Sequence, residues 1–82
     1  MKQITFTDHA EAMLIEREIA RDWVLQTITH PEATEPDTLQ LGVFRAFRSI
    51  PENGGRILRV VYFPDSDGAR IVTAFFDRNR LR

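Results

Sequence analysis

Two short glycine-containing segments separate three strand-like runs in the second half of the chain, and this spacing constrains the fold most. The runs cover residues 39–49, 56–63 and 69–77, and all three are rich in β-branched and aromatic residues. Between them lie Asn53-Gly54 and Asp67-Gly68, which are typical of tight turns because glycine accepts a positive φ. Connections this short join antiparallel neighbours, so the sequence predicts an antiparallel meander.

The first half of the chain predicts two helices joined by a tight connection at Glu18 and Ile19. Apolar side chains recur at helical spacing over residues 9–17, directly after Asp8, which fits a capping box with Glu11. The spacing recurs over 21–29, and Pro31 ends this second helix because it disfavours the helical conformation of the residue before it.

These elements predict an α+β fold in which two N-terminal helices pack on one face of a three- to four-stranded antiparallel sheet. Residues 2–6 alternate weakly and predict a short first strand or an extended lead-in. The acidic, proline-bearing stretch 31–37 predicts a turn. A chain of 82 residues has material for one hydrophobic core, so residues 1–82 are predicted to form a single domain.

Period-two alternation divides the strand residues between a helix-covered face and an open face. The helix-facing set is nearly all apolar: Phe44, Ala46, Leu58, Val60, Tyr62, Val72, Ala74 and Phe76. The open set mixes polar with apolar side chains: Arg45, Phe47, Arg59, Val61, Thr73 and Phe75. An apolar side chain left in water forgoes about 1.5–3 kcal/mol relative to burial. The open face is therefore either a wetted surface or an interaction face formed by Phe47, Val61 and Phe75.

Charge is distributed unevenly along the chain, although the net charge is only −1. Residues 1–41 hold three basic against eight acidic residues, whereas residues 42–82 hold eight arginines against four acidic residues. Either the two halves neutralise each other in the fold, or the arginines mark a surface for an anionic partner such as RNA. Arginine suits such a surface because its planar fork matches phosphate and carboxylate groups.

Composition also predicts several absences. There is no cysteine, so disulfides and thiolate zinc sites are excluded, and two histidines on separate elements do not predict a metal site. We therefore expect no cofactor. No apolar run approaches the roughly 20 residues of a membrane span, so we expect no membrane contact and a cytoplasmic protein.

Five polar residues are candidates for chemistry. His9 begins the first helix, where the helix dipole favours a neutral imidazole that serves either as a general base or as a structural donor. Arg17 follows eight residues later and cannot touch His9, but both can border one end of the sheet. Arg45 and Arg59 are expected close enough to share one phosphate, and Thr73 adds a hydroxyl on the same face.

Arg78 belongs to a basic tail over residues 77–82. Such a tail is either a solvated end of the chain or a segment that holds RNA electrostatically.

Four stretches, DHAEAMLIEREI, VLQTITHPE, RILRVVYF and ARIVTAFF, resemble those of a bacterial family of small domains of unknown function. That family is grouped with RelE/ParE-type toxins and the barnase–EndoU–colicin–RelE ribonuclease fold, and the resemblance covers about residues 3 to 76. The chain departs from the family at Ala20, where a serine or threonine often opens the second helix.

The resemblance implies a metal-independent endoribonuclease with RNA as its substrate and an antitoxin protein as a partner. In that hypothesis His9 is the acid or base, and Arg17, Arg45 and Arg59 bind the phosphate. The alternative is a non-catalytic protein-interaction module, a homodimer or one member of a toxin–antitoxin pair.

Overall fold

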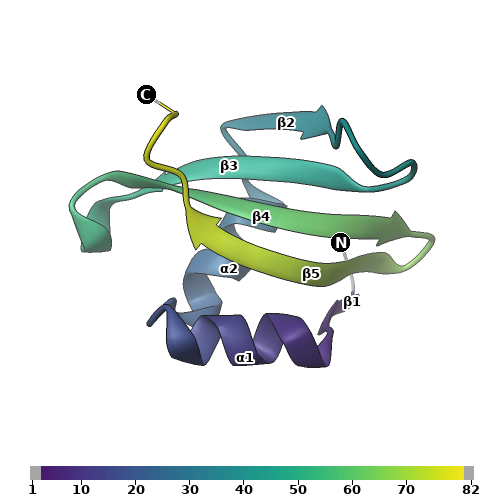
Figure 1. Cartoon of the computed structure of the whole chain (residues 1–82), viewed down its shortest axis with the longest axis horizontal. Helices are drawn as coiled ribbons and strands as arrows, with labels where there is room; N and C mark the ends of the chain where they lie inside the picture. Colours follow the sequence, from purple (N-terminus) through teal and green to yellow (C-terminus); the bar gives the residue numbers. More distant parts are fainter. Residues whose placement is uncertain (1–2, 81–82) are drawn as a thin grey trace.

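The computed structural model describes residues 3–80 and shows two helices and a five-stranded sheet (Figure 1). Its elements are β1 (Gln3–Phe6), α1 (Asp8–Glu16), α2 (Arg21–Thr29), β2 (Ala33–Pro36), β3 (Phe44–Ile50), a 3-10 turn (Pro51–Asn53), β4 (Arg56–Asp65) and β5 (Gly68–Phe76). The predicted α+β class is confirmed. Lys2 of the predicted first strand, and Leu81 and Arg82 of the predicted tail, lie outside the described residues.

The sheet has the strand order β1-β5-β4-β3-β2 and is mixed. The meander of β3, β4 and β5 is antiparallel, but β1 pairs with β5 in parallel. The prediction of three to four purely antiparallel strands is therefore wrong. The prediction failed at the edges of the sheet. It missed the parallel pairing of β1, because the partner of β1 is more than sixty positions away in the sequence and no local pattern encodes that pairing.

The segment 31–37, predicted to be a turn, contains the edge strand β2. It pairs with β3 from Ala33 opposite Phe47 to Pro36 opposite Phe44. Proline and acidic residues weaken a central strand, but an edge strand tolerates them because one side of its backbone needs no partner strand.

Two glycines at the predicted turns are required for different reasons. Gly54 has a φ of 69°, as the turn prediction assumed. Gly68 does not have a positive φ, so the turn prediction gave the wrong reason for a glycine at this position. It lies opposite Gln3 in the β1–β5 pair, where an added Cβ would stand 1.7 Å from the Gln3 carbonyl oxygen. Gly68 thus allows the backbone of β1 to reach the sheet.

The cap of α1 also differs from the prediction. Thr7, not Asp8, is the N-cap, and its Oγ1 accepts a hydrogen bond from the Ala10 N–H at 3.1 Å. The same hydroxyl donates to the Val72 carbonyl at 3.3 Å. Because β1 pairs with β5 up to Phe6, it delivers Thr7 to this position in an extended conformation.

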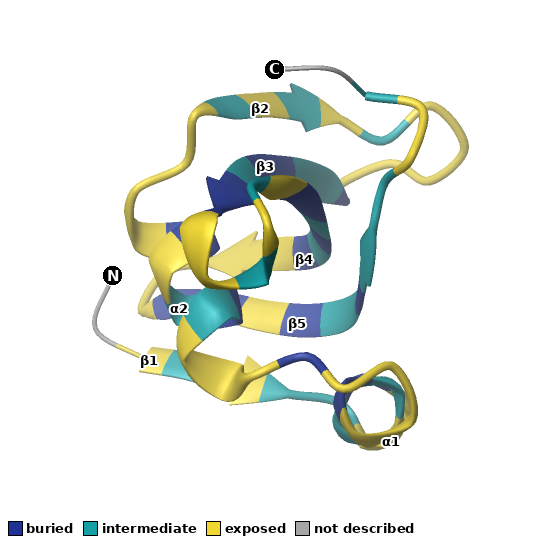
Figure 2. Cartoon of the chain, turned by 90° about the vertical axis from the view of Figure 1, so that its left-hand side faces the viewer, coloured by how far each residue is buried: buried dark blue, intermediate teal, exposed yellow. Residues whose placement is uncertain are grey.

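Both helices pack against the sheet, α2 across β3 and β4 and α1 along β5 (Figure 2). The core joins helix residues such as Leu14, Val24 and Ile28 to the inner face of the strands. Every predicted helix-facing residue lies in or against this core except Val72. A β-bulge places Thr73 opposite Val61 but Ile71 opposite Tyr62, so Val72 is the extra residue and Ile71 takes the buried position.

Each helix has nine residues. In the described part of the chain, therefore, no helix has the length and apolar character that crossing a bilayer requires.

Candidate functional site

The open face of the sheet carries the six side chains that the alternation predicted. Arg45 lies opposite Val61, and Phe47 lies opposite Arg59 on the next strand. Arg59 and Val61 lie in turn opposite Phe75 and Thr73. Arg45 and Arg59 therefore point away from the helices on one shared face, as diagonal neighbours on adjacent strands.

Three arginines and two phenylalanines form a continuous series across this face, which we call the arginine–phenylalanine stack. The Arg17 and Arg59 guanidinium carbons lie 5.7 and 5.1 Å from the Phe75 ring centroid. Arg59 also lies 5.8 Å from the Phe47 centroid, and Arg80 lies 3.7 Å from it. Each cation is attracted by the ring quadrupole, so the rings fix the positions of three positive charges.

Arg17 reaches this face from the end of α1. Its Nη1 donates a hydrogen bond of 2.9 Å to the Ala74 carbonyl. The pairing of β1 with β5 ends at Ile71, and beyond that point Thr7 and Arg17 bind the Val72 and Ala74 carbonyls in place of a strand. The carbonyl groups at this edge of the sheet need hydrogen-bond donors. By donating to one of them, Arg17 extends from the end of α1 towards Phe75.

The exposure expected for the interaction face is only partly observed. Phe47 is 3 % exposed, so the expectation that it offers an apolar contact in water is wrong. Val61 and Phe75 are half-buried. Arg59 and Arg80 pack over the Phe47 ring and bury it. The alternation of residues along one strand cannot predict this burial, because the two arginines are distant from Phe47 in the sequence.

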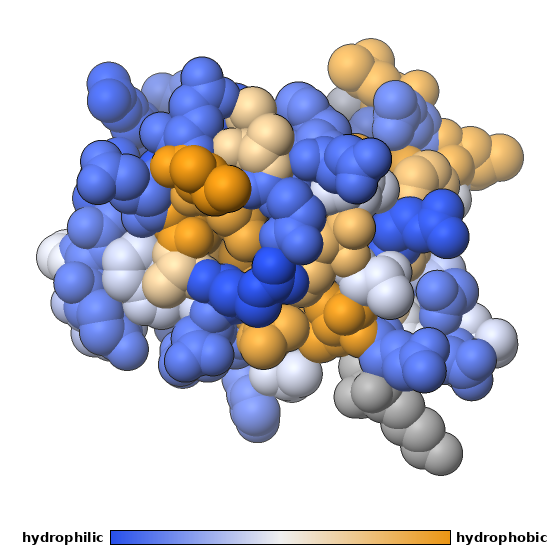
Figure 3. Space-filling view, turned by 90° about the horizontal axis from the view of Figure 1, so that it is seen from below, coloured by the Kyte–Doolittle hydropathy of each residue, from blue (hydrophilic) through white to orange (hydrophobic). Residues whose placement is uncertain are grey.

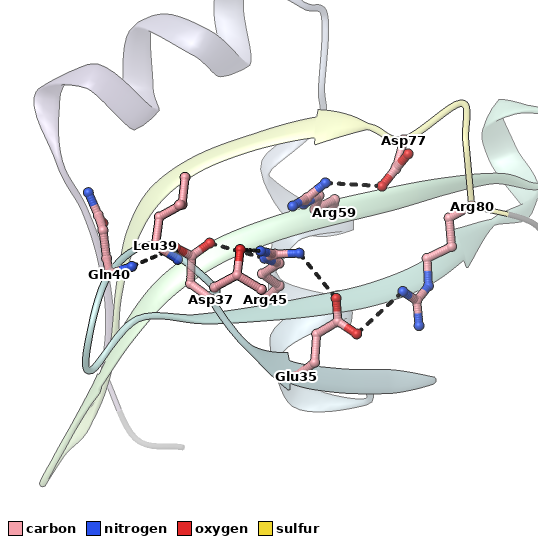
Figure 4. Close-up of polar contacts among 9 residues, drawn as sticks. Glu35, Asp37, Leu39, Gln40, Arg45, Arg59, Asp77 and Arg80 are labelled. Carbon is pink, nitrogen blue, oxygen red and sulfur yellow. Dashed lines mark hydrogen bonds and ion pairs between the residues drawn. The ribbon is translucent and has the colours of Figure 1, made fainter.

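Carboxylates accompany the arginines of the open face (Figure 4). Arg59 Nη1 lies 3.2 Å from Asp77 Oδ2, and Arg80 Nη1 lies 3.7 Å from Glu35 Oε2. Arg45 contacts Asp37 through Nε at 3.0 Å and Glu35 through Nη1 at 3.2 Å. Arg45 and Arg59 thus hold separate carboxylates, and their sharing of one phosphate stays a prediction.

Arg45 instead orders the loop between β2 and β3. Its partner Asp37 accepts hydrogen bonds from the Leu39 and Gln40 N–H groups, both at 3.0 Å. The Leu39 N–H, followed by the Arg45 side chain, lowers the pKa of Asp37 below its usual value. Arg45 has a side-chain exposure of 15 %, and these bonds make it a structural residue.

The three predicted catalytic residues are not all brought together. Arg17 and Arg59 meet around Phe75. His9 is exposed in the first turn of α1, eight residues before Arg17, which corresponds to about 12 Å along a helix axis at 1.5 Å per residue.

The remaining predicted residues lie near the stack. Thr73 is half-buried on the open face, and Arg78 is exposed in the turn after β5. Sequence reasoning did not single out Arg80 within the tail, which it left as either a solvated end or an RNA-holding segment, and it missed the carboxylates of Glu35 and Asp77. The excess of acidic residues in the first half of the chain was a signal for Glu35, and no such signal pointed to Asp77 or Arg80. Within residues 3–80, no three histidine, cysteine, aspartate or glutamate side chains gather as a metal site would require.

The sequence model of one family, described as a domain of unknown function (DUF4258), matches residues 6–76. The chain belongs to the DUF4258 family. The match runs from the end of β1 to the end of β5, so the DUF4258 region includes four members of the stack and leaves out Arg80. The expected membership of a small-domain family of unknown function is confirmed, and the link to RelE/ParE-type toxins stays a prediction. The comparisons with curated proteins and with solved structures find no match.

Proposed function

We propose that this DUF4258 protein binds single-stranded RNA through the phosphate backbone, along the arginine–phenylalanine stack. The observation that carries the proposal is the alternation of Arg17, Phe75, Arg59, Phe47 and Arg80 across one sheet face. Guanidinium groups held by ring stacking are pre-organised, so they lose little side-chain entropy when they bind phosphate.

The stack retains unused hydrogen-bond donors. A guanidinium has five N–H donors, and Arg17 uses one of its Nη groups on the Ala74 carbonyl. Arg59 uses Nη1 on Asp77, and its Nε, although it has no hydrogen-bond partner in the part of the chain described, is buried, so its Nη groups are the donors open to a ligand. Among residues 3–80, Arg17 forms no ion pair with a carboxylate, whereas Arg59 and Arg80 each have one. We therefore expect Arg17 to contact phosphate first, and the other two to share it with their carboxylates.

Strand cleavage is not included in the proposed function. Transfer of a proton from a 2′-hydroxyl requires a base within hydrogen-bond reach of the bound nucleotide. His9 lies about two helical turns from Arg17. Endoribonuclease activity through His9 stays a prediction of the family resemblance, and it requires RNA to be cut by the wild type and left intact by His9→Ala.

The test is fluorescence anisotropy with labelled single-stranded RNA over a series of salt concentrations. Three phosphate contacts give a slope of about −2 for log K against log salt, and each lost contact reduces its magnitude by about 0.7. We expect this reduction for Arg17→Gln and for Arg59→Gln.

Arg56→Gln is the matched control, because Arg56 lies on the same strand as Arg59 and stacks on Phe76, which packs against the core on the helix side. Absence of binding at low salt would refute the proposal. An equal loss in Arg56→Gln would refute it as well.

The half-buried Val61 and Phe75 support a second candidate for the same face, contact with a protein. The partner is then a second copy of the chain or an antitoxin. In that case Phe75→Asp abolishes association while Arg17→Gln leaves it intact, and light scattering of the purified protein reports a dimer directly.

A further inference from the structure

A second surface lies on the α1 side of the molecule, and Arg17 at the end of α1 is the member of the arginine–phenylalanine stack next to it in the chain. It is a shallow hollow of about 340 Å³ between α1 and the start of α2, which we call the α1–α2 hollow. Its lining consists of Glu11, Leu14, Ile15, Glu18, Ile19 and Arg21. Figure 3, which views the molecule from this side, shows apolar side chains exposed among hydrophilic ones.

The hollow has an apolar floor and an apolar rim. Leu14 and Ile19 are 6 % and 5 % exposed and close the floor. Ile15, one of the few large apolar side chains left in water, is 81 % exposed at the rim. A side chain entering the hollow would therefore find apolar contacts on the floor and on one wall.

The surroundings of the hollow hold more unpaired acidic than unpaired basic side chains. Arg17 binds the Ala74 carbonyl, and Arg21 pairs with Glu11 and stacks over the Phe6 ring at 4.2 Å. Glu16, Glu18 and Asp22 are exposed, and none forms an ion pair within the described residues. Three unpaired carboxylates stand here against one unpaired guanidinium, that of Arg17, so the surroundings of the hollow keep a net negative field.

Backbone hydrogen bonds fix the position of Glu18. Its N–H binds the Ile15 carbonyl at 3.3 Å, and the Ile19 N–H binds the Leu14 carbonyl at 2.9 Å, which closes a Schellman motif. Glu18 takes the left-handed conformation of this motif, with a φ of 55°. The carboxylate at the rim is therefore carried by an ordered backbone three residues after Ile15.

We propose that the α1–α2 hollow binds a basic amphipathic helix of a partner protein. An apolar side chain of that helix packs on Ile15 and the floor, and a lysine or arginine one turn away pairs with Glu18. Charge complementarity selects this occupant, since the acidic rim repels RNA phosphates and anionic lipid surfaces.

The test uses a labelled amphipathic peptide of about 16 residues with leucines on one helix face and lysines beside them. A second peptide has the same leucines with glutamates in place of lysines. The full chain, labelled with ¹⁵N, is titrated with each peptide and followed by NMR. We expect binding of the basic peptide only, with shifts confined to the end of α1 and the start of α2.

Surface variants locate the site without threatening the fold. Ile15→Ser is expected to weaken peptide binding about tenfold. Glu18→Gln is expected to weaken it about threefold, and less at high salt. Leu41→Ser is the matched control, because Leu41 is likewise a large exposed apolar side chain but lies on the loop between β2 and β3.

The outcomes separate this site from the proposed RNA function. Glu18→Gln should not weaken RNA binding, since it removes a negative charge next to Arg17, and Arg59→Gln should leave peptide binding unchanged. Equal binding of the acidic peptide, an equal effect of Leu41→Ser, or shifts on the open face would each overturn the proposal. A doubled mass in light scattering that Ile15→Ser returns to the monomer value would overturn it in favour of a second copy of the chain.

Discussion

At the residue scale, the chain holds an unusual conformation at Glu18. It is the one residue other than glycine with a positive φ among those described. The left-handed conformation costs a residue with a Cβ roughly 1 kcal/mol, and helices usually place glycine at this position. The sequence predicted a tight connection here but not its geometry, because glutamate gives no sign of a left-handed cap.

Glu18→Gly should therefore stabilise the fold by about 0.5–1 kcal/mol, or several degrees in Tm for a domain of this size. The same substitution at Glu16, inside the last turn of α1, should destabilise it by about 1 kcal/mol. Thermal unfolding followed by circular dichroism measures both. A lower Tm for Glu18→Gly would contradict the assigned cap.

Asp37 links stability to pH. Its pKa is lowered in the folded state, so the stability it contributes is fully present above the unfolded-state value of 3.8. That contribution is lost as the pH falls below 3.8 and through the lowered folded-state pKa. Asp37→Asn should reduce the fall in unfolding free energy between pH 5 and more acidic solutions, measured by urea denaturation. An unchanged pH dependence would show that the loop does not depend on this carboxylate.

At the scale of elements, the sequence identified the parts whose information is local. The β3–β4–β5 meander and the two helices follow from periodicity and turn residues close together in the chain. The parallel pairing of β1 and the bulge at Val72 do not, because both depend on contacts between distant segments. Contact between distant segments also explains why Phe47 was wrongly expected to be exposed and why Arg80, which packs on it, was missed.

The β1–β5 pairing can be tested at Gly68. A methyl group there would collide with the Gln3 carbonyl, so Gly68→Ala should separate β1 from β5 and destabilise the chain strongly. Gly42→Ala is the control, since Gly42 has open space around it and a φ of 82°, and should cost only about 1 kcal/mol. Urea denaturation compares the two variants. Equal losses would contradict the close approach of the strands.

At the scale of the whole molecule, charge is arranged by surface rather than by half of the chain. Neutralisation between the two halves, one of the two alternatives read from the sequence, is observed on the open face, and the anionic partner of the arginines stays a prediction. Glu35 and Asp37 of the first half neutralise Arg45 and Arg80 of the second half on the open face. Glu16, Glu18 and Asp22 carry the unneutralised acidic charge at the α1–α2 hollow. The molecule therefore carries an arginine-bearing face and an acidic face, and the two proposals assign a different partner to each.

The most direct measurement of the proposed function is the NMR spectrum of the arginine side-chain Nε–H groups during titration with single-stranded RNA. Contact along the stack predicts that the Arg17 and Arg59 signals shift with added RNA and return as salt is raised, while the Arg56 signal stays in place. Unmoved Arg17 and Arg59 signals, or an Arg56 signal that shifts as far as theirs, would contradict the assignment of RNA binding to this face.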